Sequence, residues 1–559
     1  MAAWFSGRSP WSLDYIVSIA SGAPVGLFRG PSLSLGVFLA TLSAIEGLRL
    51  RPGYMVTGLI NPDLTVGFVA DVKAKAMAAS SWGYSVFLYP AMQDREYRVV
   101  KRPLYLGPYM VEVEVVESQS IGLEELNISS IPVSTGAEAY SLLSGSPTVA
   151  RVSLENLTRR LSKPHPVFVE GMVGVVEERL EWYLSEARRI VESLAEHSVS
   201  PLVLDLKARI DSVKAEKGYS SVRQLLDSLE QAARLYYTAL IISGDLSSAR
   251  THALAARETA GRLLDRAARE APLSGLPLVA LSAMKYVESE GALRESLVFL
   301  EAMEAGFASP QRHATDTAAL LARASRGFYE SALLALAGMG GEGPGLYRAD
   351  LGRLARIAVD YAAHLYELAS EYSSQSGIRS NLTSMAAGNL VKARELLAED
   401  TPLETLASIG YSIESSTLSS LFMSLHPGYP GVAELRLEAS LQMLQRLLEL
   451  TGYPEALLFL LEPAAEEDAG STLYYVEKAI VASKLLIAAS QEMGVKLGRP
   501  KYEQSEQLRV SQEGTSMDGV SPPASAYGTA AGLLALTSLA LLLLFFFLKA
   551  ALTGRTPRA

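Results

Sequence analysis

The sequence YMVTGLINPDLTVGFVADVKAK, residues 54–75, decides how we expect this chain to fold. Tyr54 to Ile60 is a short apolar run bounded by glycine and proline, which is typical of a buried strand. Asp71 is a favoured residue type for the N-cap of a helix, and we expect a helix that carries Lys75 to follow it. The stretch therefore predicts a strand and a helix of one mixed α and β domain.

A second stretch, Gly30-Pro31-Ser32-Leu33-Ser34, opens the apolar run 35–42, which predicts a buried helix. A hydroxyl at the start of a helix is a nucleophile only if a nearby base takes its proton. Residues 1–145 contain no histidine, since the first is His165. Lysine is the natural base here, because burial disfavours its charged form and lowers its pKa toward the working pH.

The Gly-Pro-Ser element, the element Thr57-Gly58-Leu59-Ile60-Asn61-Pro62-Asp63 and the later Lys75 occur in one order. Thr57 lies 25 residues after Ser32, and Lys75 lies 43 residues after Ser32. These elements resemble the proteolytic domain of Lon-type peptidases, and most closely archaeal, membrane-associated Lon-like proteins that lack the ATPase module. The resemblance covers residues 12–145, ending near Ile131-Pro132-Val133-Ser134.

The resemblance implies an α+β fold and a serine endopeptidase that hydrolyses peptide bonds of polypeptide substrates. It implies that Ser32 is the catalytic nucleophile and Lys75 the general base, and that the hydroxyl of Thr57 helps to hold the lysine. It also implies homo-oligomers and no cofactor. Ser34 and Lys73 are the competing residues. Each lies two positions from its rival and so points to another side of its helix, and the family spacing selects Lys75.

Two departures from the family pattern favour an alternative. The chain has Ala70-Asp71 where the family usually has Gly-Gly, and an Asp71 carboxylate near Lys75 would favour the ammonium form. Only 31 residues precede Ser32, whereas the family fold begins with several strands, so we expect an N-terminal stretch upstream of the present start. The alternative is a catalytically inactive Lon-like surface protein that acts as an interaction scaffold.

Composition excludes several classes of function. The net charge of −10 gives no reason to expect nucleic acid as a partner. The chain has no cysteine, which excludes disulfides and thiolate metal sites, and its six histidines form no i, i+4 pair, so we expect no metal site. It also has no Gly-x-x-x-x-Gly-Lys-Ser/Thr loop, so we expect ATP-independent action unless a partner supplies an ATPase.

Ala530–Leu548 is an uncharged, leucine-rich segment of 19 residues, about the length that crosses the core of a lipid bilayer. Lys549, Arg555 and Arg558 follow it, and the positive-inside tendency places the C-terminus in the cytoplasm. We therefore expect a single-pass cell-membrane protein with most of the chain outside. Residues 1–11 contain no signal sequence, so this orientation needs a signal segment upstream; a tail-anchored protein with its large part in the cytoplasm is the other solution.

The whole chain of 559 residues divides into five predicted segments. Further strands are expected at 85–89 and 110–116. Leu180 to Leu194 and Val222 to Leu240 repeat apolar residues at helical spacing, and the second helix is expected to end at Gly244 with Asp245 capping the next. The segments are a peptidase-like domain (1–145), an all-helical bundle or array (146–500), a polar stalk (501–526), a transmembrane helix (527–549) and a basic tail (550–559).

Overall fold

The structure is a computed structural model, and all the residues that it describes lie between Ala2 and Val495. The described residues are 2–6, 14, 16, 31–91, 93, 95–106, 109–145, 167–197, 207–208, 222–340, 343–376, 380–424, 432–452, 455–461 and 468–495.

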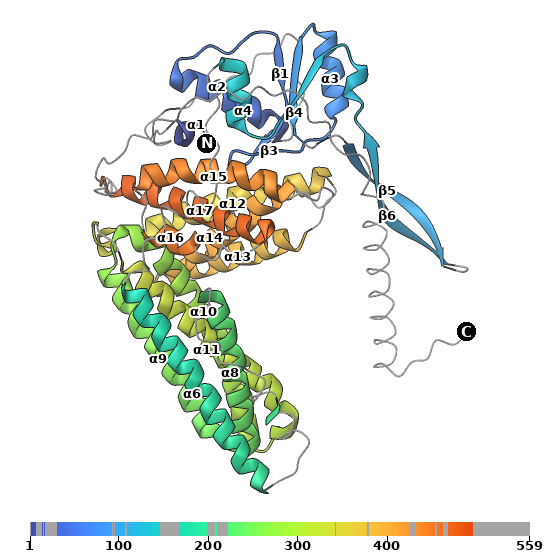
Figure 1. Ribbon diagram of the computed structural model, residues 1–559. Coiled ribbons are helices and arrows are strands. Elements are labelled where there is room, and N and C mark those ends of the chain that lie inside the picture. Colours follow the sequence, from blue (N-terminus) through green and yellow to red (C-terminus); the bar gives the residue numbers. More distant parts are fainter. Residues whose placement is uncertain are drawn as a thin grey trace, which may run out of the picture. The chain divides into compact units, whose positions relative to one another are not determined.

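The described part of the chain is mostly helical and contains a small parallel sheet. The sheet has the strand order β1-β4-β7 and consists of β1 (Tyr54–Val56), β4 (Val86–Pro90) and β7 (Ser129–Val133). Helices α2 (Ser34–Glu46) and α4 (Gly136–Ser144) lie on one side of this sheet, and α3 (Val72–Ser81) lies on the other (Figure 1). The prediction of α and β structure in the first 145 residues is confirmed at this level.

The single strand predicted for Tyr54 to Ile60 is wrong, because the chain leaves the sheet at Thr57-Gly58. After β1, a separate strand β2 (Leu59–Ile60) pairs antiparallel with β3 (Val66–Gly67). A Cβ on Gly58 would lie 2.5 Å from Val66 Cγ1 and 3.2 Å from Leu35 Cδ2. Glycine is therefore needed where the start of β2 passes between the other strand of its hairpin and helix α2.

Asp71 does not cap α3 with its side chain, which corrects the sequence-based expectation. Its backbone is in the left-handed region, with φ 57° and ψ 40°, and its side chain accepts no capping hydrogen bond. Aspartate tolerates this conformation better than most residues other than glycine.

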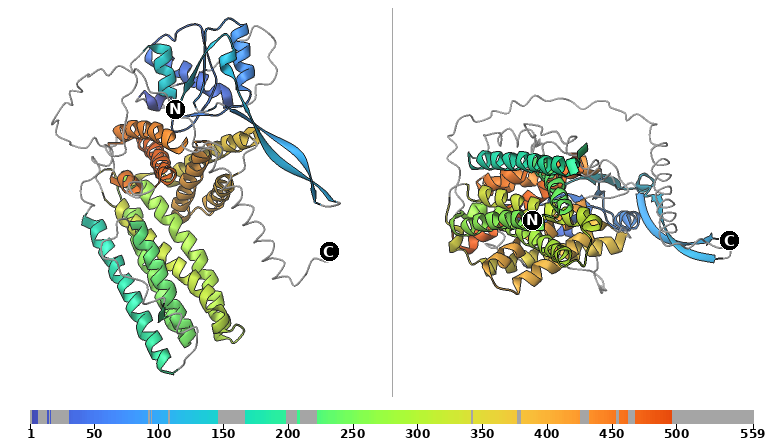
Figure 2. Two further views of the ribbon diagram at one scale, coloured as in Figure 1. Left: turned by 45° about the vertical axis from the view of Figure 1, so that its right-hand side comes forward. Right: turned by 90° about the horizontal axis from the view of Figure 1, so that it is seen from below.

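The strand predicted at 110–116 belongs to a longer two-stranded ribbon. Strands β5 (Arg95–Leu106) and β6 (Tyr109–Ser120) pair antiparallel over their whole length, from Arg95 opposite Ser120 to Leu106 opposite Tyr109. The ribbon extends away from the parallel sheet (Figure 2).

The rest of the described chain is helical, as predicted. Helix α8 ends at Ser243, Gly244 follows with φ 84°, and the Asp245 side chain accepts from the backbone N–H of Ser248 as the cap of α9. The helices are α1 (Ala2–Phe5), α6 (Val167–His197), α8 (Val222–Ser243), α9 (Leu246–Glu270), α10 (Leu276–Glu304), α11 (Pro310–Gly338), α12 (Leu351–Ser376), α13 (Asn381–Leu397), α14 (Pro402–Ser424), α15 (Val432–Thr451), α16 (Glu455–Leu461) and α17 (Ala469–Glu492), with short 3₁₀ turns at Pro31–Leu33, Leu123–Glu125, Leu273–Gly275 and Leu346–Arg348.

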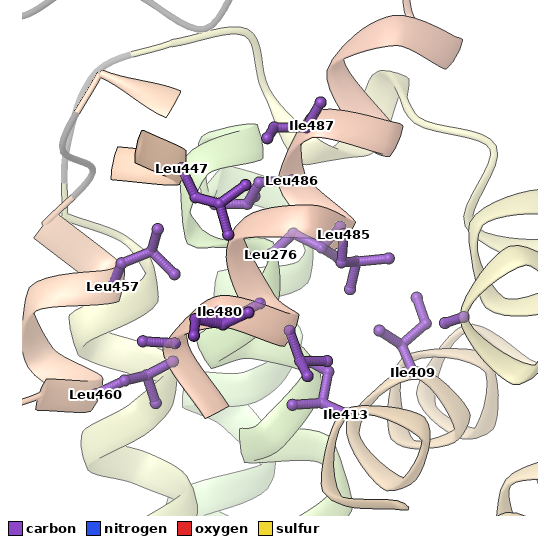
Figure 3. Packing of buried hydrophobic residues seen from close by; sticks show 14 of the residues in the cluster. Leu276, Ile409, Ile413, Leu447, Leu457, Leu460, Ile480, Leu485, Leu486 and Ile487 are labelled. Atoms are coloured by element: carbon purple, nitrogen blue, oxygen red, sulfur yellow. The ribbon is translucent and has the colours of Figure 1, made fainter. Parts of the chain in front are cut away.

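Leucine and isoleucine side chains from α10, α14, α15, α16 and α17 fill the largest core (Figure 3). A separate core joins the α/β part to the helices, because Phe68 and Val72 pack in one cluster with Tyr372 of α12 and Phe422 of α14. The two parts therefore share buried side chains and do not only touch at their surfaces.

None of the described helices combines the length and the apolar character that a membrane span requires. The predicted transmembrane helix, stalk and basic tail lie outside the described residues.

Candidate functional site

Ser32 lies in the 3₁₀ turn Pro31–Leu33, directly before α2, and is half-buried. Its carbonyl oxygen accepts a hydrogen bond of 3.1 Å from the backbone N–H of Gly58. Three residues on, the backbone N–H of Leu35 donates to the carbonyl of Gly58 over 3.2 Å. These two bonds fix the start of α2 against the Thr57-Gly58 step, so Ser32 and Thr57 belong to neighbouring backbone segments.

The structure gives Ser34, the competing nucleophile, a structural task. Its Oγ accepts a 2.8 Å hydrogen bond from the backbone N–H of Ile60 and lies 3.4 Å from the carbonyl oxygen of Gly58, to which it donates. The hydroxyl thus pairs the backbone N–H of Ile60 in β2 and gives the Gly58 carbonyl a second donor.

Thr57 is buried, with 3% of its surface exposed, at the point where the chain leaves β1. Its backbone N–H donates to the carbonyl of Leu88 over 3.0 Å, which ties it to the neighbouring parallel strand β4.

Lys75 is in the first turns of α3 and is half-buried. Its Nζ donates a 2.7 Å hydrogen bond to the carbonyl oxygen of Ala70, in the segment that joins β3 to α3. The competing Lys73 points elsewhere, because its Nζ lies 3.6 Å from a carboxylate oxygen of Glu125 in an exposed ion pair.

The chain between Thr57 and Lys75 is held together by the β2–β3 hairpin. Leu59 is opposite Gly67, so the residues just before β2 and those just after β3 lie at the same, open end of the hairpin. At this end, Thr57-Gly58 leads into β2, and Ser32 is hydrogen-bonded to Gly58. The segment that leads to Lys75 begins at the same end, after β3. A direct hydrogen bond between Ser32 Oγ and Lys75 Nζ stays a prediction.

Gln93 holds the segment after β3, a role that the sequence did not reveal. Its side-chain amide is buried and pairs with Val69 in both directions: Oε1 accepts from the Val69 N–H over 3.1 Å, and Nε2 donates to the Val69 carbonyl. The Gln93 amide thus makes, with the N–H and the carbonyl of Val69, the two hydrogen bonds that a neighbouring strand would otherwise provide.

The turn of the hairpin, residues 61–65, is the centre of a buried polar network. The Asp63 carboxylate, fully buried, accepts four hydrogen bonds: Thr65 N–H (2.9 Å), Thr65 Oγ1 (2.6 Å), Ser440 Oγ (2.7 Å) and Ser424 Oγ (3.2 Å). Lys484 Nζ donates to the Pro62 carbonyl over 2.7 Å and to Tyr361 OH over 3.2 Å. Burial lowers the pKa of Lys484 to about 8. A buried aspartate and a buried lysine therefore meet at one turn.

The Ser440 hydroxyl lies between the carboxyl groups of Asp63 and Glu477 and can donate to only one of them at a time. Its Oγ is 2.7 Å from Asp63 Oδ2 and 3.1 Å from Glu477 Oε1, yet a hydroxyl has one hydrogen. Burial, followed by the negative charge of Asp63, raises the pKa of Glu477 well above its usual range. This shift favours the neutral, protonated form of Glu477 beside Ser440 and Asp63.

We expect Glu477→Gln to remove a pH dependence of stability. A raised folded-state pKa gives a stabilisation that is complete below the unfolded-state pKa, near 4.5, and is lost as pH rises. Between pH 5 and 7.5 the free energy of unfolding should fall by up to about 1.4 kcal/mol per pH unit through Glu477 alone. Lys484, with a lowered pKa, changes protonation mainly above this window.

Urea unfolding of the wild type and of Glu477→Gln at several pH values measures this difference. The other charged groups that face Glu477 are Asp63 and Lys484, which both proteins keep. Stability curves that stay parallel across pH 5–7.5 would show that Glu477 is ionised in the folded protein.

Sequence reasoning did not find Ser440, Glu477 or Lys484, although one signal was present. Lys484 is the one charged residue of the apolar stretch AIVASKLLIAAS, residues 479–490, and a lysine in such a stretch is either exposed or paired inside the protein. Its partner, Pro62, is 422 residues away, and no local pattern indicates such a contact.

In the described part of the chain, no group of three His, Asp or Glu side chains is placed to hold a metal ion. The chain matches no family model, no curated protein and no solved structure.

Proposed function

We propose that this protein is a Lon-type serine endopeptidase, in which Ser32 is the nucleophile, Lys75 the general base and Thr57 a supporting hydroxyl. The observation that supports this most is the fold of the motif-bearing segments. Ser32 at the start of α2 bonds to Gly58, and the β2–β3 hairpin leads from there to the α3 helix that carries Lys75. Segments that are 43 residues apart in the sequence are thereby linked by one small hairpin.

The proposed reaction uses the uncharged amine of Lys75. The amine takes the proton of the Ser32 hydroxyl while Oγ attacks the carbonyl carbon of the peptide bond. Backbone N–H groups near the start of α2 stabilise the oxyanion of the tetrahedral intermediate. The ammonium of Lys75 then protonates the leaving amine, which departs and leaves an acyl-enzyme. Water, deprotonated by Lys75, attacks the ester and releases the second product with Ser32 restored.

The contact between Lys75 and Ala70 is compatible with this role. The Nζ of Lys75 donates to the Ala70 carbonyl oxygen, a bond that both an ammonium and an uncharged amine can make. Ser34 is engaged with the backbone of β2, and this favours Ser32 as the nucleophile.

Covalent labelling tests this proposal on the full-length protein in detergent. A fluorophosphonate reacts with an activated serine hydroxyl and with few others, and mass spectrometry of the digested protein then identifies the labelled residue. We expect one phosphonylated peptide, carrying Ser32, and no label in Lys75→Met. Label on Ser34, or equal label in both proteins, would contradict the assignment. Absence of any label together with no hydrolysis of unfolded polypeptide would support the scaffold alternative.

We also propose that the peptidase is held at the cell membrane by Ala530–Leu548, with its C-terminus in the cytoplasm. Protease added to intact cells should then degrade the large N-terminal part. Complete protection of that part would contradict this orientation.

A further inference from the structure

The helices that follow the α/β part, α6 to α17, are called the helical tract here. Residues of this tract hold the turn of the β2–β3 hairpin from outside the α/β part. Three helices contribute: Met423 of α14 accepts from Asn61 Nδ2 over 3.4 Å, Ser440 of α15 donates to Asp63, and Lys484 of α17 donates to the Pro62 carbonyl. Ser440 and Lys484 each expose at most 3% of their surface to solvent, and Asn61 and Asp63 are fully buried. This turn is therefore an internal part of the molecule.

The hairpin cannot hold its own position. Each of its strands has two residues, with Leu59 opposite Gly67 and Ile60 opposite Val66. Two-stranded hairpins are only marginally stable in water, even when they are longer. The Asn61 N–H donates to the Thr65 carbonyl over 2.9 Å and closes the turn, but it does not fix the turn in space. The α/β part holds one side of the hairpin, since Val66 N–H donates to the Ser134 carbonyl and Gly136 N–H donates to the Leu64 carbonyl, both over 2.9 Å. The helical tract holds the turn itself, at Asn61, Pro62 and Asp63.

The hairpin is connected to both proposed catalytic residues at its open end. At its open end, Gly58 bonds to the carbonyl of Ser32, and the other strand continues through Phe68 and Val69 to the helix with Lys75. Phe68 also lies 5.9 Å from the guanidinium carbon of Arg436, a buried residue of α15. A displacement at the turn would therefore move Ser32 and Lys75 relative to each other.

We propose that Ser440, through its hydrogen bond to Asp63, is a positioning residue for the Ser32–Lys75 site, and that the helical tract is a structural part of the peptidase. Lys484 and Ser424 support the same turn. This inference rests on the proposed function. It assigns a catalytic consequence to Ser440, which lies more than 360 positions after Lys75 in the sequence.

Ser440→Ala tests the proposal in the full-length protein. A misplacement of reacting groups by about 1 Å can cost 10²-fold in rate, so we expect kcat for an unfolded polypeptide to fall roughly 10–100-fold. KM should stay within about threefold, because Ser440 is buried away from bound substrate. Ser440→Thr keeps the hydroxyl and should retain most of the wild-type kcat.

Ser483→Ala is the matched control. Ser483 is also fully buried on a helix of the same tract, but its Oγ donates to the Ala479 carbonyl of its own helix over 2.7 Å. It should leave kcat unchanged. If Ser440→Ala does not fold, Ser424→Ala replaces it, since this variant removes the longer contact to the same Asp63 oxygen.

The outcomes separate this inference from the proposed function. Hydrolysis that survives Ser32→Ala would refute the Ser–Lys peptidase itself. An inactive Ser32→Ala protein together with a wild-type kcat for the folded Ser440→Ala protein would refute the positioning role alone. A loss of kcat that is equal in Ser440→Ala, Ser440→Thr and Ser483→Ala would show a general packing effect, and this too would overturn the proposal.

Discussion

Lys75→Met should lower kcat for an unfolded polypeptide by about 10²–10⁴-fold, the contribution typical of a general acid–base group. Ser32→Ala should lower it further, since removal of a nucleophile abolishes the acyl-enzyme route. Methionine keeps much of the apolar length of lysine, so the packing of α3 changes little. The measurement is steady-state hydrolysis of a fluorescent, unfolded protein by the purified full-length chain.

Lys73→Met is the control for the base. It is the same substitution two residues earlier on α3, and the side chain it removes takes part in an exposed ion pair with Glu125. Exposed ion pairs contribute about 0–1 kcal/mol to stability, so Lys73→Met should keep nearly all activity. If Lys73→Met loses activity and Lys75→Met keeps it, the two lysines have been assigned in the wrong order.

Asp63→Asn should lower the free energy of unfolding by about 3–5 kcal/mol, as expected when one member of a buried charge network is removed. The carboxylate accepts from Thr65, Ser424 and Ser440, and its charge opposes the lowering of the Lys484 pKa by burial. An asparagine amide provides one acceptor oxygen fewer and places an N–H₂ group among donors. Lys484 then stays buried without this counter-charge.

Asp71→Asn is the matched control for stability. It makes the same change eight residues later, at an exposed position whose backbone φ of 57° asparagine adopts readily. The free energy of unfolding should stay within about 0.5 kcal/mol of the wild-type value. Hydrogen exchange at residues 57–69 reports the hairpin directly. Equal protection in Asp63→Asn and Asp71→Asn would refute the central place of Asp63 in this network.

Local pattern predicted the helices well, because each helix depends on residues close in sequence. The apolar spacing from Val222 onward, the glycine stop at Gly244 and the cap at Asp245 all appear as expected. The break between β1 and β2 was missed, since an apolar run shows burial but not a change of partner strand. Gly58 was the available signal, and its reason, close approach to Val66 and Leu35, is visible only in three dimensions.

The sequence indicated the residues at the open end of the β2–β3 hairpin but not those that contact its turn. Ser32, Thr57 and Lys75 lie in motifs that a sequence displays, and the structure adds the hairpin that links them. The other end of the hairpin depends on Ser440 and Lys484, which are far away in the chain. A contact of this kind depends on how whole helices pack, so neither propensity nor spacing indicates it.

A crystal structure of the full-length protein would measure the distance between Ser32 Oγ and Lys75 Nζ. We expect these two atoms to lie within hydrogen-bond reach, about 2.6–3.2 Å, or slightly more without a bound substrate. An Nζ that is paired with a carboxylate and turned away from the Ser32 hydroxyl would contradict this expectation.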